Sequence, residues 1–323
     1  MKIAVIDDYA DAFRKTAAFP RLQGHEITVF RDSEKDPAKQ AARLHGFDAL
    51  VLTQQRTRLP RAQIEHLRGI RLICQTGKYT AHIDVAACTE KGIAVCAGAG
   101  GSSHTTAELA WGLILASLRH LPFELAQMKR GHWQSTSGTA LQGKVLGIYA
   151  YGKIGSVVAA VGRAFAMKVT CWGRSGSLER ARAAGFDIAS SREVFFESAD
   201  VLSLHLPLND ATRGIVTAAD LARMKPAALL VNTSRAQLIE SGALVDALKN
   251  RRPGFAAVDV YEDEPVLGDH PLLLLDNALC TPHLGYATSE SYETMYGATV
   301  EQLLAFDRGE PIDLANPEAL DRR

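Results

Sequence analysis

Two glycines between an apolar run and a helical segment are the clearest chemical signal in the sequence. Gly152 and Gly155 follow the expected strand Val145–Ala150 and precede the expected helix Val157–Phe165. Glycine lets a backbone approach a pyrophosphate closely, and a helix N-terminus supplies free N–H donors and positive potential. Ala150 replaces the first glycine of a GxGxxG motif and keeps the side chain small. The pattern predicts a dinucleotide site; the alternative is that the two glycines only end a strand.

The turn after the next expected strand indicates which dinucleotide binds. Lys168–Trp172 is typical of a strand and leads into Gly173, Arg174 and Ser175, with no Asp or Glu at the turn. A carboxylate there accepts the ribose hydroxyls of NAD, whereas an arginine suits the 2′-phosphate of NADP. Arg174 offers a fork of donors and Ser175 a hydroxyl, which favours NADP over NAD. The alternative for Arg174 is a solvated loop residue.

Short apolar segments alternate with segments of helical period along the chain. This alternation predicts parallel sheets covered by helices on both faces. The expected strands of the first half are Ile3–Ile6, Glu26–Phe30, Ala49–Leu52, Leu72–Gln75 and Ile93–Cys96. Those of the second half are Val145–Ala150, Lys168–Trp172, Val201–Leu204, Ala228–Val231, Ala256–Val260 and Ala278–Cys280, six strands that make a complete Rossmann-type sheet.

Three further segments organise the chain between and after these strands. Ala97–Ser103 is rich in glycine and serine, which predicts a linker or hinge. Thr105–Met128 has an apolar pattern that predicts one long helix, and Ser289–Phe306 also has helical period. We therefore expect a domain boundary near the glycine-rich segment.

The composition excludes several classes of protein. The 323 residues carry 36 Lys+Arg and 36 Asp+Glu, so no overall field attracts nucleic acid or a membrane surface. The five cysteines lack CxxC spacing, which argues against a disulfide framework and a metal site. The N-terminus reaches acidic residues too early for a signal peptide, and no window is long enough to span a bilayer. We expect a soluble cytoplasmic protein of two domains.

Five ordered blocks resemble the D-isomer-specific 2-hydroxyacid dehydrogenase family over nearly the whole chain. Each block alone is a weak signal, whereas their order and near-family spacing together are a specific one. The blocks are LQGKVLGIYAYGKIG (141–155), HLPLNDATRGIV (205–216), MKPAALLVNTSRAQLIE (224–240), AAVDVYEDEP (256–265) and TPHLGY (281–286).

The resemblance implies a division of labour between two α/β domains. Residues 99–286 are expected to form the NAD(P)-binding domain, a Rossmann-type doubly wound parallel sheet. Residues 1–98 with 287–323 are expected to form a flavodoxin-like substrate domain, completed by the last helix. Two chain crossings between the domains would act as a hinge, so that closure excludes water before hydride transfer. The resemblance also implies a homodimer through the cofactor domain and the long helix.

Three residues of these blocks correspond to the family's catalytic residues. The implied reaction transfers a hydride between NAD(P) and a small D-2-hydroxy acid or 2-keto acid. Arg235 would bind the substrate carboxylate and polarise the carbonyl through its rigid donor fork. His283 would be the acid/base, and Glu264 would hold its tautomer and favour its charged form. As isolated residues, the arginine would more often be an ion-pair partner and the histidine a solvated or capping residue.

The resemblance also carries over cofactor contacts. Gly152, Lys153, Ile154 and Gly155 would lie at the pyrophosphate, and Leu206 and Pro207 along the adenosine side. Thr233 and Asp259 would lie near the nicotinamide, where Asp259 could hold the carboxamide. The alternative for Asp259 is an aspartate that caps a turn at a strand end.

The expected substrate loop of the first domain departs from the family pattern. Thr76, Gly77 and Lys78 follow a strand, and in the family this loop offers backbone N–H groups to the substrate carboxylate. Gly77 matches, but Tyr79 stands where the second glycine is usual and Ala81 where an aspartate is usual. Lys78 and Tyr79 are therefore candidates for reshaping the pocket, and a solvated lysine is the alternative.

Three rival functions remain beside reduction of glyoxylate, hydroxypyruvate or a related acid. Arg56 falls where the D-3-phosphoglycerate dehydrogenase branch holds the substrate phosphate, but Gln54 replaces the first arginine and no extra C-terminal domain is expected. The formate-oxidising branch carries glutamine where this chain has Glu264. A dinucleotide-sensing interaction protein of the co-repressor kind would need no catalysis, although the chain has no disordered, motif-bearing extension.

Overall fold

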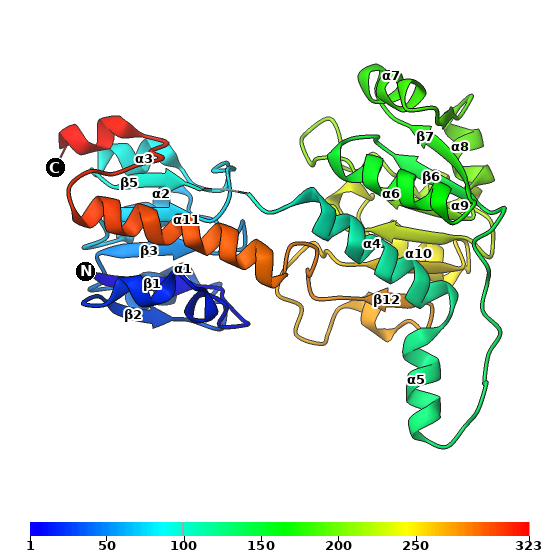
Figure 1. Cartoon of the computed structure of the whole chain (residues 1–323), viewed down its shortest axis with the longest axis horizontal. Coiled ribbons are helices and arrows are strands. Elements are labelled where there is room, and N and C mark those ends of the chain that lie inside the picture. The colour runs from blue at the N-terminus through cyan, green and yellow to red at the C-terminus, as the bar shows by residue number, and fades with distance from the viewer. Residues whose placement is uncertain (99, 323) are drawn as a thin grey trace. The chain divides into compact units, whose positions relative to one another are not determined.

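The computed structural model describes residues 1–98 and 100–322, which fold into two compact units (Figure 1). Unit 1 comprises Met1–Ser102 and Ala287–Arg323, and unit 2 comprises Ser103–Tyr286. The described part of each unit contains its own parallel sheet and its own buried core. Ala99, within the predicted hinge, and the terminal Arg323 lie outside the described residues.

Unit 1 is built on a five-stranded sheet in the order β2-β1-β3-β4-β5, in which every pair of neighbours is parallel. Its side chains alternate between two cores, with Val5 and Val51 on one face and Ile6 and Leu50 on the other. Since both faces are covered, the central strands are largely apolar. The strands are β1 (Lys2–Ile6), β2 (Glu26–Val29), β3 (Ala49–Leu52), β4 (Leu72–Gln75) and β5 (Ala94–Ala97), and the helices are α1 (Pro37–Arg43), α2 (Arg61–His66), α3 (Val85–Glu90) and α11 (Ser289–Asp307).

The last helix belongs to unit 1. Tyr296, Val300 and Leu303 of α11 are fully buried in the same core as the strands. The tail beyond it lies along β5, because the N–H of Ala97 donates to the carbonyl of Asp313 over 3.0 Å. The final segment of the chain therefore covers what would otherwise be an exposed sheet edge.

Unit 2 contains a seven-stranded parallel sheet in the order β12-β11-β10-β9-β6-β7-β8. Six of these strands match the predicted ones, and the seventh, β8, is a two-residue strand that no sequence period reveals. The order reverses between β6 and β9, which creates the crevice where doubly wound sheets bind ligands. The strands are β6 (Val145–Tyr149), β7 (Lys168–Trp172), β8 (Asp187–Ile188), β9 (Val201–Leu204), β10 (Leu229–Asn232), β11 (Phe255–Val258) and β12 (Ala278–Cys280).

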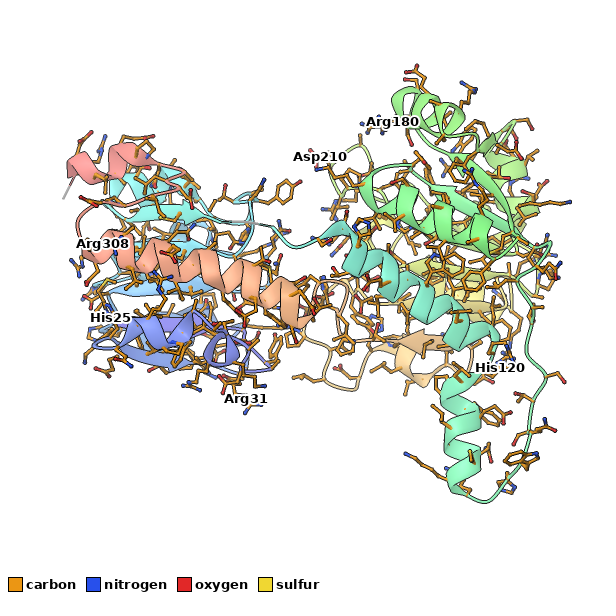
Figure 2. The ribbon with its side chains drawn as sticks, viewed as in Figure 1. His25, Arg31, His120, Arg180, Asp210 and Arg308 are labelled. Carbon is orange, nitrogen blue, oxygen red and sulfur yellow. The ribbon has the colours of Figure 1, made fainter. Side chains whose placement is uncertain are left out.

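The predicted long helix Thr105–Met128 is wrong as a single element. The structure has two helices, α4 (Ser103–Leu118) and α5 (Leu121–Lys129), separated at His120, whose φ is 50° (labelled in Figure 2). Pro122 lies in the first turn of α5, where its missing N–H and its ring interrupt a continuous helix. The remaining helices of unit 2 are α6 (Lys153–Ala164), α7 (Ser175–Ala183), α8 (Arg192–Ser198), α9 (Ala218–Arg223) and α10 (Ala243–Lys249).

Membrane-spanning helices and metal-binding clusters are both absent from the described residues. Within residues 1–98 and 100–322, no helix is both long and apolar enough to cross a membrane. The same residues contain no group of three or more His, Cys, Asp or Glu side chains placed to hold a metal ion.

Candidate active site

The glycine-rich segment forms a tight turn between β6 and α6. Gly152 is the N-cap of α6, and a Cβ at Gly155 would lie 2.4 Å from the carbonyl oxygen of Ala150. Only glycine allows this close approach of helix and strand. Ala150, in the position of the missing first glycine, has a φ of 76°, so the left-handed turn is kept at a conformational cost.

A cavity of about 420 Å³ lies at the carboxyl ends of β6, β7 and β9. Among the predicted cofactor residues, it is lined by Gly152, Arg174, Leu206 and Pro207, but not by Lys153, Ile154, Gly155, Ser175, Thr233 or Asp259. The sequence reasoning missed three other residues of its wall, Trp172, Arg180 and His205. The histidine of the H-L-P block was a signal that could have revealed one of them.

The residues around this cavity fit a dinucleotide. A Cβ at Gly152 would meet no atom within 4 Å, so there is open space above the helix N-terminus. Both ring nitrogens of His205, in the cavity wall, are buried with no hydrogen-bond partner among the described residues. The hydroxyl of Thr233, which follows β10 and does not line the cavity, is buried and unpartnered in the same sense. Burial lowers the pKa of His205 to about 4, so the ring is neutral near pH 7. A buried polar atom without a partner costs about 1–3 kcal/mol, and a polar ligand can supply one.

The side of the cavity formed by the start of α7 is basic. Arg174 is the N-cap of α7, and Arg180 on the same helix donates to the carbonyl of Tyr151 over 3.3 Å (Arg180 is labelled in Figure 2). Ser177 accepts the N–H of Tyr151 at 2.7 Å and so ties this helix to the glycine-rich turn. No Asp or Glu is among the described residues that line the cavity. The charge on this side therefore suits an anion.

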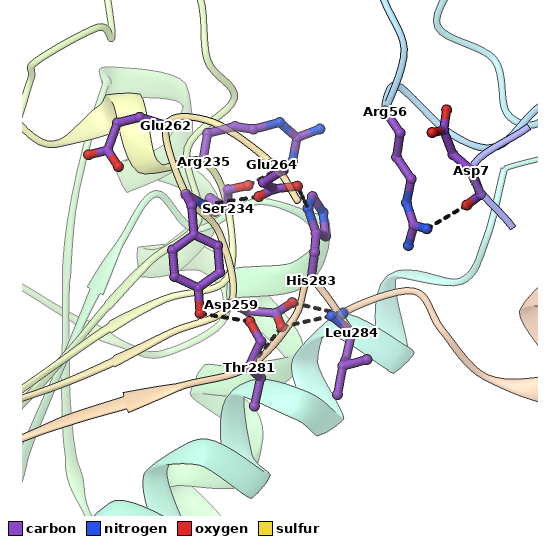
Figure 3. Close-up of polar contacts among 12 residues, drawn as sticks. Asp7, Arg56, Ser234, Arg235, Asp259, Glu262, Glu264, Thr281, His283 and Leu284 are labelled. Carbon is purple, nitrogen blue, oxygen red and sulfur yellow. Dashed lines mark hydrogen bonds and ion pairs between the residues drawn. The ribbon is translucent and has the colours of Figure 1, made fainter. Parts of the chain in front are cut away.

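His283 and Glu264 form a close pair at the ends of neighbouring strands (Figure 3). His283 Nδ1 lies 2.6 Å from Glu264 Oε2, and Glu264 Oε1 accepts the N–H of Tyr261 at 2.9 Å. Burial alone would raise the pKa of Glu264, but its hydrogen bonds and the nearby His283 and Arg235 hold that pKa below its ordinary value. Glu264 is therefore ionised near neutral pH, and Nδ1 of His283 is the donor.

A neighbouring acid of this loop, Glu262, contacts a different histidine. Glu262 Oε2 lies 3.2 Å from His270 Nε2 rather than beside His283. The acid before the proline, which the resemblance selects, is the one that contacts the histidine.

Arg235 lies just beyond β10 and within electrostatic reach of Glu264 (Figure 3). Burial lowers the pKa of Arg235, and the charge of Glu264 opposes that effect. Its backbone carbonyl accepts from the amide of Asn232 at 2.9 Å, which fixes the turn. The three predicted catalytic residues thus gather at the carboxyl edge of one sheet, from the ends of β10, β11 and β12.

The carboxylate of Asp259 organises the turn that carries His283. It accepts the hydroxyl of Thr281 at 2.6 Å and the N–H groups of Leu284 and Gly285 at 2.7 and 2.8 Å. These three bonds match the turn-capping alternative, so the predicted cofactor contact of Asp259 stays a prediction.

The predicted substrate loop of unit 1 is held by side chains at its base. Thr76 is buried, and its hydroxyl donates to the carbonyl of Leu52 at 2.9 Å and accepts the N–H of Gln54 at 2.7 Å. Gly77 has a φ of 106°, which disfavours any other residue, whereas Lys78 is exposed. The hydroxyl of Thr76 is thus used by the fold, and the contacts of all three residues with a substrate stay predictions.

Arg56 of unit 1 is held in place from two sides. Its guanidinium donates to the backbone carbonyl of Asp7 at 2.8 Å and lies 4.5 Å from the centre of the Tyr9 ring. Figure 3 shows the contact with Asp7. A hydrogen bond and a cation–π contact together give this cation a defined position at the carboxyl end of β3.

The sequence of unit 2 matches a known protein family. A sequence profile described as D-isomer specific 2-hydroxyacid dehydrogenase, NAD binding domain, matches residues 111–285. The chain belongs to the D-isomer-specific 2-hydroxyacid dehydrogenase family. The matched residues fall within unit 2, which contains the glycine-rich turn, the cavity and the His283–Glu264 pair.

Individual members of the 2-hydroxyacid dehydrogenase family are similar over most of the chain. The glyoxylate reductase of Aeropyrum pernix is 37% identical over 264 residues, 79% of this chain and 78% of that protein. The D-3-phosphoglycerate dehydrogenase of Methanocaldococcus jannaschii is 37% identical over 265 residues, but the match spans only 50% of its length. A solved phosphoglycerate oxidoreductase of Vibrio cholerae O395 has a TM-score of 0.92 and 48% identity, covering 96% of this chain and 99% of its own.

Proposed function

We propose that the protein is an NAD(P)-dependent D-2-hydroxyacid dehydrogenase that reduces a small 2-keto acid such as glyoxylate or hydroxypyruvate. The observation that carries the proposal is the 2.6 Å contact between His283 and Glu264, with Arg235 nearby at the carboxyl edge of the dinucleotide-binding sheet. Unit 2 would serve as the cofactor domain and unit 1 as the substrate domain. The similarity to the Aeropyrum pernix glyoxylate reductase supports the substrate class.

Each residue of the site has a role that follows from its chemistry. Bound NAD(P)H would supply the hydride. Arg235, a fork of donors that stays charged even when buried, would bind the carboxylate and polarise the carbonyl. Because Nδ1 of His283 faces Glu264, Nε2 is the ring nitrogen that would give a proton to the carbonyl oxygen. Ionised Glu264 would stabilise the imidazolium, and in the oxidation direction the same histidine would accept the proton.

We further propose that NADP is preferred over NAD. The arginines on the basic side of the cavity support this, since Arg174 begins α7 and Arg180 lies one turn and a half further along the same helix. Ser175 adds a hydroxyl at the helix start. Guanidinium groups bind phosphate oxygens through charge-assisted hydrogen bonds, whereas the ribose hydroxyls of NAD are usually held by a carboxylate, and no Asp or Glu is among the described residues of this cavity wall.

We also propose that the protein forms a homodimer through α5 and the segment after it. Leu125, Met128 and Trp133 are 62%, 62% and 78% exposed, and no residue of α5 is buried. Glu124 holds the following segment against α5 by accepting the hydroxyl of Thr136 at 2.6 Å. A preformed apolar arm of this kind is typical of a surface covered by another protein, here a second copy.

A second candidate substrate is D-3-phosphoglycerate. The observation in its favour is the anchored cation Arg56, and the similar proteins of Methanocaldococcus jannaschii and Vibrio cholerae are named for phosphoglycerate. Gln54, in place of a further arginine, weakens this candidate.

A substrate screen tests the proposal. Purified protein is mixed with NADPH or NADH and with glyoxylate, hydroxypyruvate, pyruvate or 3-phosphohydroxypyruvate, and loss of dinucleotide absorbance is followed. We expect turnover of one of the first two acids. Higher kcat/KM for 3-phosphohydroxypyruvate would favour the second candidate. Dinucleotide binding without turnover of any 2-keto acid would contradict the enzyme and favour a dinucleotide-sensing protein.

A further inference from the structure

Tyr261 contacts both loops of the histidine–glutamate pair. Its backbone N–H donates to Glu264 Oε1 at 2.9 Å, and its hydroxyl donates to the backbone carbonyl of Thr281 at 3.0 Å. The same carbonyl accepts the backbone N–H of His283 at 3.0 Å. One residue therefore links the loop after β11, which carries Glu264, to the loop after β12, which carries His283; Figure 3 labels Glu264, Thr281 and His283.

The hydroxyl of Tyr261 binds the backbone turn from Thr281 to His283, which sets the direction of the His283 side chain. A bond from the N–H of His283 to the carbonyl of Thr281 closes a three-residue γ-turn around Pro282. His283 itself has a φ of 54°, a left-handed conformation that costs a non-glycine residue free energy and persists only where neighbours hold it. Asp259 holds the residues that follow His283, through the N–H groups of Leu284 and Gly285. Tyr261 holds the residue at the start of the turn, through the carbonyl of Thr281.

The ring of Tyr261 is buried and packs against the ring of His270. Its residue is 7% exposed, and it meets the His270 ring edge-on with centroids 5.1 Å apart and planes at 70°. His270 Nδ1 accepts the N–H of Leu272, so its Nε2 is the nitrogen that donates to Glu262 at 3.2 Å. Burial raises the pKa of Tyr261, so its hydroxyl stays a neutral donor across the pH range in which the enzyme would work. The hydroxyl of Tyr261 therefore remains a neutral hydrogen-bond donor on a buried ring.

We propose that Tyr261 is a positioning residue that sets the distance and alignment between His283 and Glu264. The inference rests on the proposed function, because it takes these two residues as the acid/base pair. Without the hydroxyl, the carbonyl of Thr281 accepts only the N–H of His283, and the γ-turn is no longer tied to Tyr261. The pair then lengthens beyond 2.6 Å, and Glu264 stabilises the imidazolium less well.

The test compares Tyr261→Phe with Tyr296→Phe. Both variants keep the ring and remove one buried hydroxyl, but Tyr296 is in unit 1, where its hydroxyl lies 3.0 Å from Thr53 Oγ1. The first readout is the low-field proton NMR signal of the imidazole N–H shared with Glu264, identified by its absence in His283→Gln. We expect this signal to move upfield in Tyr261→Phe and to stay in place in Tyr296→Phe. This readout needs no turnover, so it separates the inference from the proposed function.

The second readout is the pH profile of kcat/KM for 2-keto acid reduction. Activity requires a protonated histidine, so it falls as the pH rises. In Tyr261→Phe we expect the midpoint of that fall at lower pH and a kcat reduced about 5- to 50-fold, the effect of a slightly misplaced acid. An NMR signal and pH midpoint equal to those of the wild type, even with a lower melting temperature, would overturn the inference. Equal changes in Tyr296→Phe would overturn it as well.

Discussion

Charges at the site are arranged so that each ionised group has an opposite neighbour. Arg235 is half-buried and lies within electrostatic reach of Glu264, and Glu264 contacts His283. Partial burial alone would favour the protonated carboxyl, yet its hydrogen bonds and the nearby charges hold the pKa of Glu264 below the ordinary value. A carboxylate that stays ionised near neutral pH is what an imidazole that must gain and lose a proton requires.

The cofactor preference is tested by Arg174→Ala, with Arg182→Ala as control. Arg182 is an exposed residue of the same helix that does not line the cavity. Loss of a charge-assisted bond costs about 1.5–3 kcal/mol, so we expect the dissociation constant for NADPH to rise about 10- to 100-fold. The constant for NADH should change less than about twofold, since ribose hydroxyls gain little from a guanidinium. Fluorescence titration measures both; an unchanged ratio would reject the phosphate role.

Sequence reasoning selects residues by type and position, and the structure brings three of the selected residues together, while their catalytic roles stay predictions. Arg235, Glu264 and His283 come from three separate strand ends, and the parallel sheet brings those ends to one edge. Tyr261 and Arg180 could not be found in that way, because their contacts depend on side-chain direction and on helix placement. For the same reason, nothing in the sequence indicated that the hydroxyl of Thr76 is used by the fold.

At the scale of elements, the junction of β6 and α6 limits what the glycine-rich turn can tolerate. In Gly155→Ala, the new Cβ would lie 2.4 Å from the carbonyl oxygen of Ala150, so the helix must move away from the strand. We expect the free energy of unfolding to fall by about 1–3 kcal/mol and dinucleotide affinity to fall with it. Thermal denaturation and NADPH titration measure the two effects.

Gly297→Ala is the matched control for that substitution. Gly297 is inside α11, and a Cβ there meets no atom within 4 Å. Alanine should stabilise this helix by about 0.5–1 kcal/mol and leave binding unchanged. Equal behaviour of the two variants would contradict the close-approach argument.

Elements were predictable where the pattern is long or apolar enough. Strands such as Ala49–Leu52 and Val201–Leu204 were predicted with their observed bounds, because both faces of a parallel sheet are buried. The break between α4 and α5 was missed although Pro122 marks it, since the apolar pattern continues across the break. The two residues of β8 are too few to show any period.

At the scale of the molecule, the arm formed by α5 predicts the oligomeric state. Leu125→Glu with Met128→Glu places two charges on its apolar surface. Desolvating these charges in an interface is unfavourable, so the dimer should dissociate. Light scattering should give twice 34.9 kDa for the wild type and 34.9 kDa for the variant. Val194→Glu, on an exposed apolar residue of α8, should leave the mass unchanged; a monomeric wild type would refute the dimer.

Two histidines, the buried His205 and the half-buried His82, make the stability of the whole chain depend on pH. Burial lowers the pKa of both His82 and His205 to about 4, against 6.5 when unfolded. Between these pH values the unfolded chain binds protons at these histidines and the folded chain does not. The free energy of unfolding is therefore highest above pH 6.5 and falls as the pH drops toward 4. We expect a loss of roughly 1 kcal/mol per pH unit from the buried His205 and a smaller loss from the half-buried His82, whose charge water partly screens. Urea unfolding at pH 7.5 and 5 measures it, and His205→Asn should flatten the dependence.

His283 is the acid/base of the proposed reaction, and the kinetics of His283→Gln test that role. Glutamine keeps a polar side chain of similar size but cannot deliver the proton, so kcat for 2-keto acid reduction should fall by about 10²–10⁴-fold. The dissociation constant for NADPH should stay within about twofold, because the cavity is not lined by His283. His25→Gln, which alters a histidine 3.9 Å from Asp307 in unit 1, should retain wild-type turnover. A His283→Gln enzyme with wild-type kcat would contradict the proposed mechanism.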